Sequence, residues 1–289
     1  MIEPGLLPPR PPDAHKGDAG RVFLLAGSIG FSGAAALCTM GALRVGAGLV
    51  TLGLPKSLHD PMVEKLTEAM FRVLPETKAG SLSLKGLVEI VSTAEKMDAV
   101  GIGPGLSQQQ ETKSLVRQLL PKIAKPLVLD ADGLNALAEE VAVLRRLPLP
   151  MILTPHPGEM GRLTQLSSEE IQSDRQRIAV EFAKKHRVIV VLKGHRTVVA
   201  SYDSALYIND TGNPGMASGG CGDVLTGMIV GLLGQQLAPF DAARLGVYLH
   251  GLAGDLAANE RGEIGLIASD LVDRIPQAIR QYQQNASAV

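Results

Sequence analysis

The sequence predicts an α/β fold in which a mostly parallel sheet lies between two layers of helices. Short apolar runs of strand length alternate with helical stretches along most of the chain. The first run, RVFLLAG at 21–27, is short, apolar and ended by glycine, which suits a buried strand. Four glycine-rich or polar segments directly follow strands, and ligands of such folds bind beyond the carboxyl ends of the strands. We therefore expect these segments to converge on one site.

The expected strands are short, and the last three are joined by short polar turns. These three are therefore expected to form an antiparallel edge of the sheet. The nine predicted strands are 21–27, 49–55, 69–74, 99–102, 126–130, 151–154, 188–192, 196–201 and 205–209.

The expected helices fill the segments between most strands and make the C-terminal third strongly helical. The helix predicted for 168–185 begins Ser-Ser-Glu-Glu, so that Ser167 or Ser168 can cap it with a carboxylate three residues later. The longer predicted helices are 33–46, 108–120, 168–185, 216–234, 241–259 and 270–281.

Length and composition indicate one well-packed domain. The chain has 289 residues, of which 45% are hydrophobic and 20% charged, which excludes a disordered protein. There is no repeat, linker or break in composition, so we expect a single domain over residues 1–289. The Pro-rich residues 1–19 read as extended chain, of which residues 1–12 form a lead-in.

Charge and cysteine content exclude several classes of function. Lys and Arg number 28 against 29 Asp and Glu, so there is no basic surplus for nucleic acid or an anionic membrane. No apolar run reaches the roughly 20 residues of a membrane span, and the N-terminus has no signal-peptide layout. Cys38 and Cys221 belong to no CxxC pair, which argues against a zinc module or a disulfide scaffold. We expect a cytoplasmic protein.

The segment 213–227 carries the strongest chemical signal. Gly219, Gly220 and Gly222 directly precede an apolar helix. Backbone N–H groups at a helix start carry partial positive charge, and glycines let several of them line one concavity. This arrangement suits a phosphate that gains charge during transfer.

Asp223 follows these glycines and is well placed to take a proton from a hydroxyl that attacks the phosphate. The alternative is a helix N-cap, worth about 1 kcal/mol. The glycines upstream favour the base. We expect the field of the helix to keep Asp223 ionised and therefore only weakly basic.

A second segment, 154–163, reads Thr-Pro-His-Pro-Gly-Glu and follows a strand. The prolines hold an extended loop, and a short helix opens at Gly158 and Glu159. Glu159 is a candidate to hold Mg²⁺ through water and His156 to bind substrate. The alternative is a rigid turn with a capping Glu.

Four further segments lie beside predicted strands. Lys-Gly-His-Arg-Thr at 193–197 suits the phosphates of a nucleotide, although an ordinary charged hairpin has the same pattern. Segment 101–106 permits close backbone approach but lacks the third glycine of a dinucleotide fingerprint. Segment 130–135 offers carboxylates near a metal, Asp132 being equally a cap for the helix that follows. Segment 27–34 is a strand-to-helix turn able to receive part of a ligand.

Together these motifs closely resemble the NAD(P)H-hydrate dehydratase family, a ribokinase-like group of repair enzymes. The resemblance spans about residues 13–275 and rests on HKGDAGRVFLLAGS, GIGPGL, LVLDADGLNAL, LTPHPGEMGRL, VVLKGHRTVV, GNPGMASGGCGDVLTG and HGLAGDLAA. It implies a three-layer α/β/α ribokinase-like fold in a stand-alone dehydratase without a fused epimerase domain. It also implies cytoplasmic tetramers and a functional partnership with a separate NAD(P)H-hydrate epimerase.

The resemblance implies a lyase reaction driven by a kinase-like half-step. Family members bind the S epimer of hydrated NADH or NADPH and use ADP, commonly in bacteria, or ATP, in eukaryotes. The nucleotide phosphorylates the misplaced ring hydroxyl, and phosphate is then eliminated. Phosphate is a far better leaving group than hydroxide.

Site residues follow from the same resemblance. Asp223 would activate the substrate hydroxyl, while Gly219, Gly220 and Gly222 would form the anion hole. Mg²⁺ is expected near Glu159 and Asp130, through water. The residues implied for nucleotide binding are Lys193, Gly194, His195, Arg196, Thr197, Asn213, Gly215, Met216, Ala217, Ser218 and Gly222. Those implied for the hydrated dinucleotide are Ala34, Gly103, Gly105, His156, Pro157, Gly158, Glu159, Arg162 and Asp223. His195 and Arg196 are bulkier and more basic than expected, which bears on nucleotide preference.

Two other functions compete with this one. A ribokinase-like vitamin kinase would phosphorylate a small heterocyclic alcohol, such as hydroxymethylpyrimidine or hydroxyethylthiazole, and stop there. Such kinases resemble the 154–163 region with Asn in place of His156, which argues against this reading. A nucleotide-binding sensor without turnover would not need Asp223.

Overall fold

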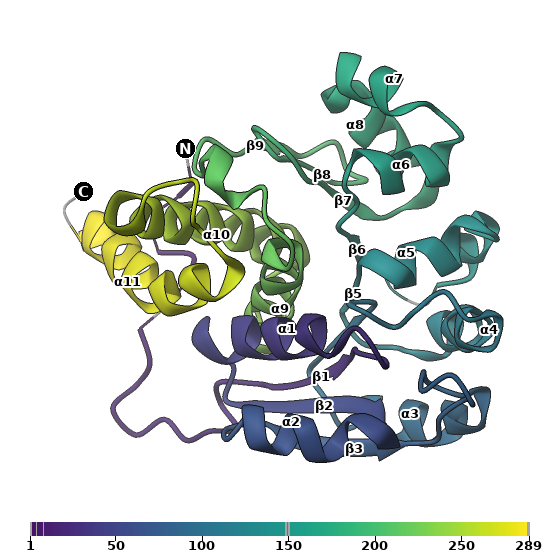
Figure 1. Cartoon of the computed structure of the whole chain (residues 1–289). Coiled ribbons are helices and arrows are strands. Elements are labelled where there is room, and N and C mark those ends of the chain that lie inside the picture. The colour runs from purple at the N-terminus through teal and green to yellow at the C-terminus, as the bar shows by residue number, and fades with distance from the viewer. Residues whose placement is uncertain (1, 4, 8, 148, 150, 288–289) are drawn as a thin grey trace.

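A computed structural model describes residues 2–3, 5–7, 9–147, 149 and 151–287. In this part of the chain nine strands form one sheet in the order β3-β2-β1-β4-β5-β6-β7-β8-β9 (Figure 1). The strands are β1 Arg21–Leu25, β2 Leu49–Pro55, β3 Met70–Leu74, β4 Ala99–Ile102, β5 Leu127–Leu129, β6 Ile152–Leu153, β7 Ile189–Leu192, β8 Val198–Ala200 and β9 Leu206–Ile208.

The pairing of the strands confirms the predicted fold class. Strands β3 to β7 are parallel, and β8 and β9 add an antiparallel edge. Each of the nine predicted runs contains one of these strands. Strands β2 and β4 have the predicted bounds, and the other seven are shorter because the flanking residues belong to the loops at the sheet edges.

Helices cover both faces of the sheet (Figure 1). Side chains alternate between two buried clusters along β1, with Val22 and Leu24 in one, Phe23 and Leu25 in the other. The helices are α1 Ser32–Arg44, α2 His59–Lys65, α3 Leu87–Ala94, α4 Gln110–Leu119, α5 Ala131–Ala138, α6 Pro157–Thr164, α7 Ser168–Ser173, α8 Arg175–His186, α9 Cys221–Gly234, α10 Pro239–Arg261 and α11 Ala268–Ser287.

Three predicted helices were wrong in their extent, of which the one predicted for 270–281 continues to Ser287. The helix expected over 168–185 is two helices, because Asp174 has non-helical φ and ψ of −151° and 63° and caps α8 through the N–H of Arg177. Ser167, one of the two predicted caps, forms a capping box with Glu170 at the start of α7. The helix expected from Met216 begins at Cys221, since Gly220 has a φ of +95°. Helices α2 and α3 were not predicted.

Close packing of α1 on α9 fixes the position of the glycine-rich turn. A Cβ at Gly227 would lie 1.9 Å from the carbonyl oxygen of Cys38, and one at Gly41 would lie 2.4 Å from that of Val224. Only glycine permits this approach of the two backbones. The first turn of α9 is thereby held at the sheet edge where the parallel strands end.

The described part of the N-terminal lead-in packs on the C-terminal helices. The hydroxyl of Tyr282 in α11 donates to the carbonyl oxygen of Glu3 and accepts from the N–H of Leu6. Leu7 is buried. The expectation for positions 1, 4 and 8 lies outside the described residues. No described helix is both long and apolar enough to cross a membrane.

Candidate active site

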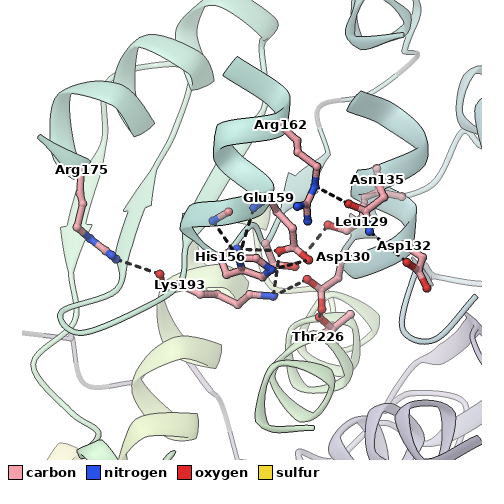
Figure 2. A network of polar contacts seen from close by, with 12 residues as sticks. Leu129, Asp130, Asp132, Asn135, His156, Glu159, Arg162, Arg175, Lys193 and Thr226 are labelled. Atoms are coloured by element: carbon pink, nitrogen blue, oxygen red, sulfur yellow. Dashed lines mark hydrogen bonds and ion pairs between the residues drawn. The ribbon is translucent and has the colours of Figure 1, made fainter. Parts of the chain in front are cut away.

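The carboxyl ends of β5, β6 and β7 bring three charged side chains together (Figure 2). Asp130 directly follows β5, Lys193 directly follows β7, and Glu159 lies in the first turn of α6, after β6. Because neighbouring parallel strands end at the same edge, residues distant in sequence become neighbours. This edge is the predicted location of the site.

Asp130 is a fully satisfied buried carboxylate. It is 1% exposed. Its Oδ1 accepts a hydrogen bond from Lys193 Nζ at 2.6 Å, and its Oδ2 accepts one from the hydroxyl of Thr226 at 2.7 Å. Thr226 belongs to α9. Asp130 therefore ties β7 and α9 to the end of β5.

The Lys193 ammonium also lies 3.8 Å from Glu159 Oε2, so one cation faces two buried acids. Burial alone would lower the pKa of Lys193, but attraction by Asp130 and Glu159 outweighs it and raises this pKa. Burial and the charge of Asp130 raise the pKa of Glu159, which Lys193 opposes. Lys193 is thus directed at the acids, not only at a nucleotide as predicted.

His156 and Glu159 form the rigid turn considered as an alternative. His156 Nδ1 accepts from the N–H groups of Gly158 and Glu159, at 3.0 and 3.3 Å, and Glu159 Oε2 accepts from the N–H of His156 at 2.8 Å. Burial, and then the charges of Lys193 and Arg162, lower the pKa of His156. His156 is therefore a neutral ring whose Nδ1 is an acceptor. This capping leaves Nε2 of the half-exposed ring as a donor.

Asp223 is not the helix cap. The N-cap of α9 is Gly220, without a side-chain capping bond, and Asp223 lies in the first turn. Among the described residues its carboxylate has no hydrogen-bond partner. Burial, followed by the negative charge of Asp130, raises the pKa of Asp223 to about 7. The expectation that the helix field keeps it a weak base was wrong, because desolvation and neighbouring carboxylates outweigh the partial charge of the helix.

The turn before α9 presents unpaired amides. Within the described chain no acceptor binds the N–H groups of Gly219, Gly220, Gly222 or Asp223, whereas those of Cys221 and Val224 are bonded. A Cβ built at Gly219 would meet nothing within 4 Å. Several unpaired donors therefore lie in one turn, with open space at Gly219 and a partly buried carboxylate beside them, which suits an anion site.

A pocket of about 480 Å³ adjoins this turn. Nine of the predicted nucleotide-binding residues line it: Lys193, Gly194, His195, Arg196, Thr197, Asn213, Met216, Ala217 and Gly222. Gly215 and Ser218 do not. The N–H of Gly215 instead donates to the side chain of Asn213, and a Cβ at Gly215 would lie 2.6 Å from the carbonyl oxygen of Glu263.

The pocket has walls that sequence reasoning missed. They come from the segment after β9 and from α10: Asn209, Thr211, Gly212, Val247, His250 and Gly251. Pro214, Cys221 and Leu225 also line the pocket and belong to the segment 213–227 identified from the sequence. The HGLAGDLAA motif, which starts at His250, carried this information without an assigned role. His250 Nε2 lies 2.9 Å from the carbonyl oxygen of Cys221, and burial lowers the pKa of His250 to about 4. The neutral ring therefore donates to the first residue of α9.

The residues expected to hold the hydrated dinucleotide lie on two sides of Asp130. A Cβ at Gly105, which has a φ of +64°, would lie 3.0 Å from that of Ala34. One at Gly103, with a φ of +138°, would overlap the carbonyl oxygen of Asp130. On the other side, α6 carries Arg162, whose Nε donates to Asn135 at 2.9 Å (Figure 2). His156, Pro157, Gly158 and Glu159 lie at the start of the same helix.

Asp132 connects two segments of the site through hydrogen bonds. Its Oδ2 accepts from the N–H of Ser107 and its Oδ1 accepts from the side chain of Asn135. The N-cap position of α5 belongs to Asp130, so Asp132 is not the cap considered as an alternative. Across the described residues no group of three or more acidic, His or Cys side chains is arranged to hold a metal ion. A metal here would need ligands from water or a bound molecule.

Comparison with known proteins gives consistent results. The profile of the NAD(P)H-hydrate dehydratase family matches residues 22–277. The ADP-dependent (S)-NAD(P)H-hydrate dehydratase of Bacillus subtilis is 37% identical over 96% of this chain and 95% of its own length. The bifunctional NAD(P)H-hydrate repair enzyme Nnr of Moorella thermoacetica is 47% identical, over 98% of this chain and 53% of its own. The chain thus spans about half the length of the bifunctional relatives it matches.

Solved structures agree with the sequence relatives. The B. subtilis ADP/ATP-dependent NAD(P)H-hydrate dehydratase co-crystallised with ATP/Mg²⁺ superposes with a TM-score of 0.83 at 35% identity, covering 96% of this chain and 94% of that one. A hydroxyethylthiazole kinase of Pyrococcus horikoshii has a TM-score of 0.62 at 15% identity, covering 92% of each chain. The second likeness shows the shared fold alone.

Proposed function

Because the chain belongs to the NAD(P)H-hydrate dehydratase family, we propose that it catalyses the ADP-dependent dehydration of the S epimer of NAD(P)H-hydrate to NAD(P)H. One observation carries the proposal. The unpaired amides of Gly219, Gly220 and Gly222 lie next to Asp223 and beside a pocket lined by the predicted nucleotide-binding residues. Backbone N–H groups that can bind phosphate oxygens therefore lie beside a carboxylate that can accept a proton.

The proposed reaction has two steps. The ring hydroxyl of the hydrate attacks the terminal phosphorus of ADP, a new P–O bond forms, and the bond to the departing AMP oxygen breaks. Asp223 takes the proton of the hydroxyl. The ring C–O bond then breaks with loss of a neighbouring proton, releasing phosphate and restoring NAD(P)H. With ATP as donor the first step would release ADP.

The environment of Asp223 suits its proposed role. A general base is most effective when its pKa lies near the working pH, and burial raises that of Asp223 to about 7. The amides of the glycine turn would bind the phosphoryl oxygens as their charge grows. No rearrangement of the turn is needed, because those donors already lack partners within the described chain.

The donor set at Asp130 and Glu159 fits Mg²⁺. Both are buried carboxylates with oxygen donors of the kind that Mg²⁺ prefers, and the Lys193 ammonium lies between them, so this place already accommodates positive charge. Mg²⁺ bound there, partly through water, would neutralise charge on the phosphates of the nucleotide. Its co-crystallisation with the B. subtilis enzyme supports the expectation.

The rest of the functional assignment follows the family. We propose that one catalytic domain makes up residues 1–289, that the substrate lies between the Ala34–Gly105 contact and the start of α6, and that the chain acts in the cytoplasm as a homotetramer. A separate NAD(P)H-hydrate epimerase would supply the S epimer. The bifunctional names of the longer relatives support this partnership.

The test is direct. Purified protein is incubated with Mg²⁺, ADP and (S)-NADH-hydrate while absorbance at 340 nm is followed. Recovery of absorbance with release of AMP and phosphate is expected. An accumulating phosphorylated alcohol without recovery would indicate a kinase, and nucleotide binding without any product would indicate a sensor.

Asp223→Asn separates the role of the carboxylate from that of the pocket. The variant should bind ADP nearly normally and lose at least about 10²-fold in turnover, the scale of a lost general base. Asp60→Asn, which removes a carboxylate that is 94% exposed on α2, is the matched control. Undiminished turnover of Asp223→Asn would contradict the assigned role.

A further inference from the structure

The Lys193 ammonium lies between two sites that need positive charge at different times. On one side it contacts Asp130 at 2.6 Å and approaches Glu159 at 3.8 Å (Figure 2). On the other side, a Cβ at Gly222 would lie 3.3 Å from Lys193 Nζ, so the ammonium also adjoins the first turn of α9. Lys193 further lines the 480 Å³ pocket.

The backbone of Lys193 is fixed, which restricts any movement to its side chain. Its N–H donates to the carbonyl oxygen of Pro155 at 2.8 Å. Arg175 Nη2 donates to the carbonyl oxygens of Leu192 at 2.7 Å and Lys193 at 3.2 Å. The four-carbon stem of a lysine has many rotamers, and its ammonium can therefore change partners without loop movement.

Charge balance indicates why it would change partners. Without ligands, one ammonium faces Asp130 and Glu159, and the negative charges of both acids also raise the pKa of nearby Asp223. A nucleotide brings further negative charge into this partly buried site, where repulsion is poorly screened. A divalent cation against Asp130 and Glu159 would add charge there and free the ammonium for the phosphates.

We propose that Lys193 holds the place of the divalent cation in the nucleotide-free protein and moves to the nucleotide phosphates when metal and nucleotide bind together. The inference rests on the proposed function in that the ligand is a nucleotide with a divalent cation. It goes beyond that function by giving Lys193 two successive partners. It makes metal binding weak without nucleotide, since the metal must displace a buried ammonium.

Binding of Mn²⁺ to nucleotide-free protein, measured by electron paramagnetic resonance, tests the first half. Lys193→Met should bind Mn²⁺ at least about tenfold more tightly than wild type, because the competing cation is gone. Lys113→Met is the matched control: Lys113 forms a 2.7 Å pair with Glu139 and is 15% exposed, against 17% for Lys193. Unchanged or weaker Mn²⁺ binding by Lys193→Met would overturn the proposal.

Calorimetric titration with ADP at saturating Mg²⁺ tests the second half. Lys193→Met should bind ADP at least about tenfold more weakly, and Lys113→Met should bind it as wild type does. Undiminished ADP affinity in Lys193→Met would show that the ammonium does not reach the phosphates. None of these arms contains NAD(P)H-hydrate, so their outcome is separate from the test of the proposed reaction.

Two further measurements cover the case in which Lys193→Met does not fold. Lys193→Arg keeps a cation beside Asp130 and should bind Mn²⁺ as weakly as wild type. In wild type labelled with ¹³Cε-lysine, the Lys193 resonance, assigned by its loss in Lys193→Arg, should shift when Mg²⁺ and ADP are added together. An unshifted resonance, or tight Mn²⁺ binding by Lys193→Arg, would refute the exchange of partners.

Discussion

Asp223→Asn should stabilise the nucleotide-free protein, and more so as pH rises. The pKa of Asp223 is about 7 in the folded protein, against 3.8 for the exposed group. Between these values the unfolded chain has released this proton and the native protein has not. The contribution of the protonated Asp223 carboxyl to the free energy of unfolding is therefore complete below pH 3.8 and is lost as pH rises toward 7.

The size of the effect follows from the shift. Three pH units correspond to about 4 kcal/mol at 1.36 kcal/mol per unit, and the part that falls between pH 5 and pH 8 is about 3 kcal/mol. Water reaching the partly exposed carboxylate makes both figures upper bounds. Asparagine keeps the shape of the side chain but does not ionise, so the free energy of unfolding of Asp223→Asn should lack this dependence on pH.

Urea unfolding followed by circular dichroism at pH 5, 6, 7 and 8 measures the difference. The stability advantage of Asp223→Asn over wild type should grow by up to about 3 kcal/mol between pH 5 and pH 8. Asp60→Asn should run parallel to wild type, since that carboxylate is 94% exposed. A parallel course for Asp223→Asn as well would refute the reasoning that desolvation holds a proton on Asp223.

Four further predictions concern the same site. The kcat/KM of wild type should fall about tenfold per pH unit below about pH 7, as Asp223 becomes protonated; a level profile from pH 5 to 7 would exclude it as the base. Gly219→Ala should fold with an unchanged Tm and lose at least about 10²-fold in kcat/KM, since its methyl group enters the open space of the anion site. Gly220→Ala should instead lose about 1–3 kcal/mol of stability, because Gly220 has a φ of +95° and its methyl group would lie 2.4 Å from Leu37. Thermal unfolding and kinetics separate the two, and equal behaviour would contradict the assignment. Arg175→Ala should raise the KM for ADP about tenfold with a smaller change in kcat, because the carbonyl oxygens of Leu192 and Lys193 lose their donor. Partial recovery in Arg175→Lys would support the view that Arg175 positions Lys193, and an unaltered KM would exclude it. Cys38, which is fully buried, should resist a thiol reagent until the protein unfolds, because burial raises the pKa of its thiol. Rapid labelling of Cys38 in the native protein would contradict this.

The strand pattern could be read from the sequence because it depends on local apolar runs. Most of these runs lie in a sheet that helices cover on both faces, so their apolar residues are buried as the pattern indicates. The division of the 168–185 helix could not be read, since it depends on the φ and ψ of one residue, Asp174, within an otherwise helical pattern. Propensity sums over a window do not detect a single such residue.

The parts of the site could be predicted, but not the partners of each part. The glycine turn, Asp223, Glu159 and Asp130 were identified from motifs that follow strands. Their mutual charges were not, because pairs such as Asp130 and Lys193 lie 63 positions apart in the chain and meet only through the order of the strands. The wrong expectation for the ionisation of Asp223 has this origin.

The three acids of the site differ in how their charge is compensated, and this difference separates structural from chemical roles. Asp130 has two hydrogen-bond donors, and Glu159 accepts the N–H of His156 while facing Lys193. Asp223 has no donor among the described residues, so its ionised form is uncompensated until a ligand supplies one. A substrate hydroxyl held against Asp223 is such a donor. The carboxylate that lacks a donor in the empty protein is therefore the one that a hydroxyl-bearing ligand relieves, which links its burial to its proposed role as base.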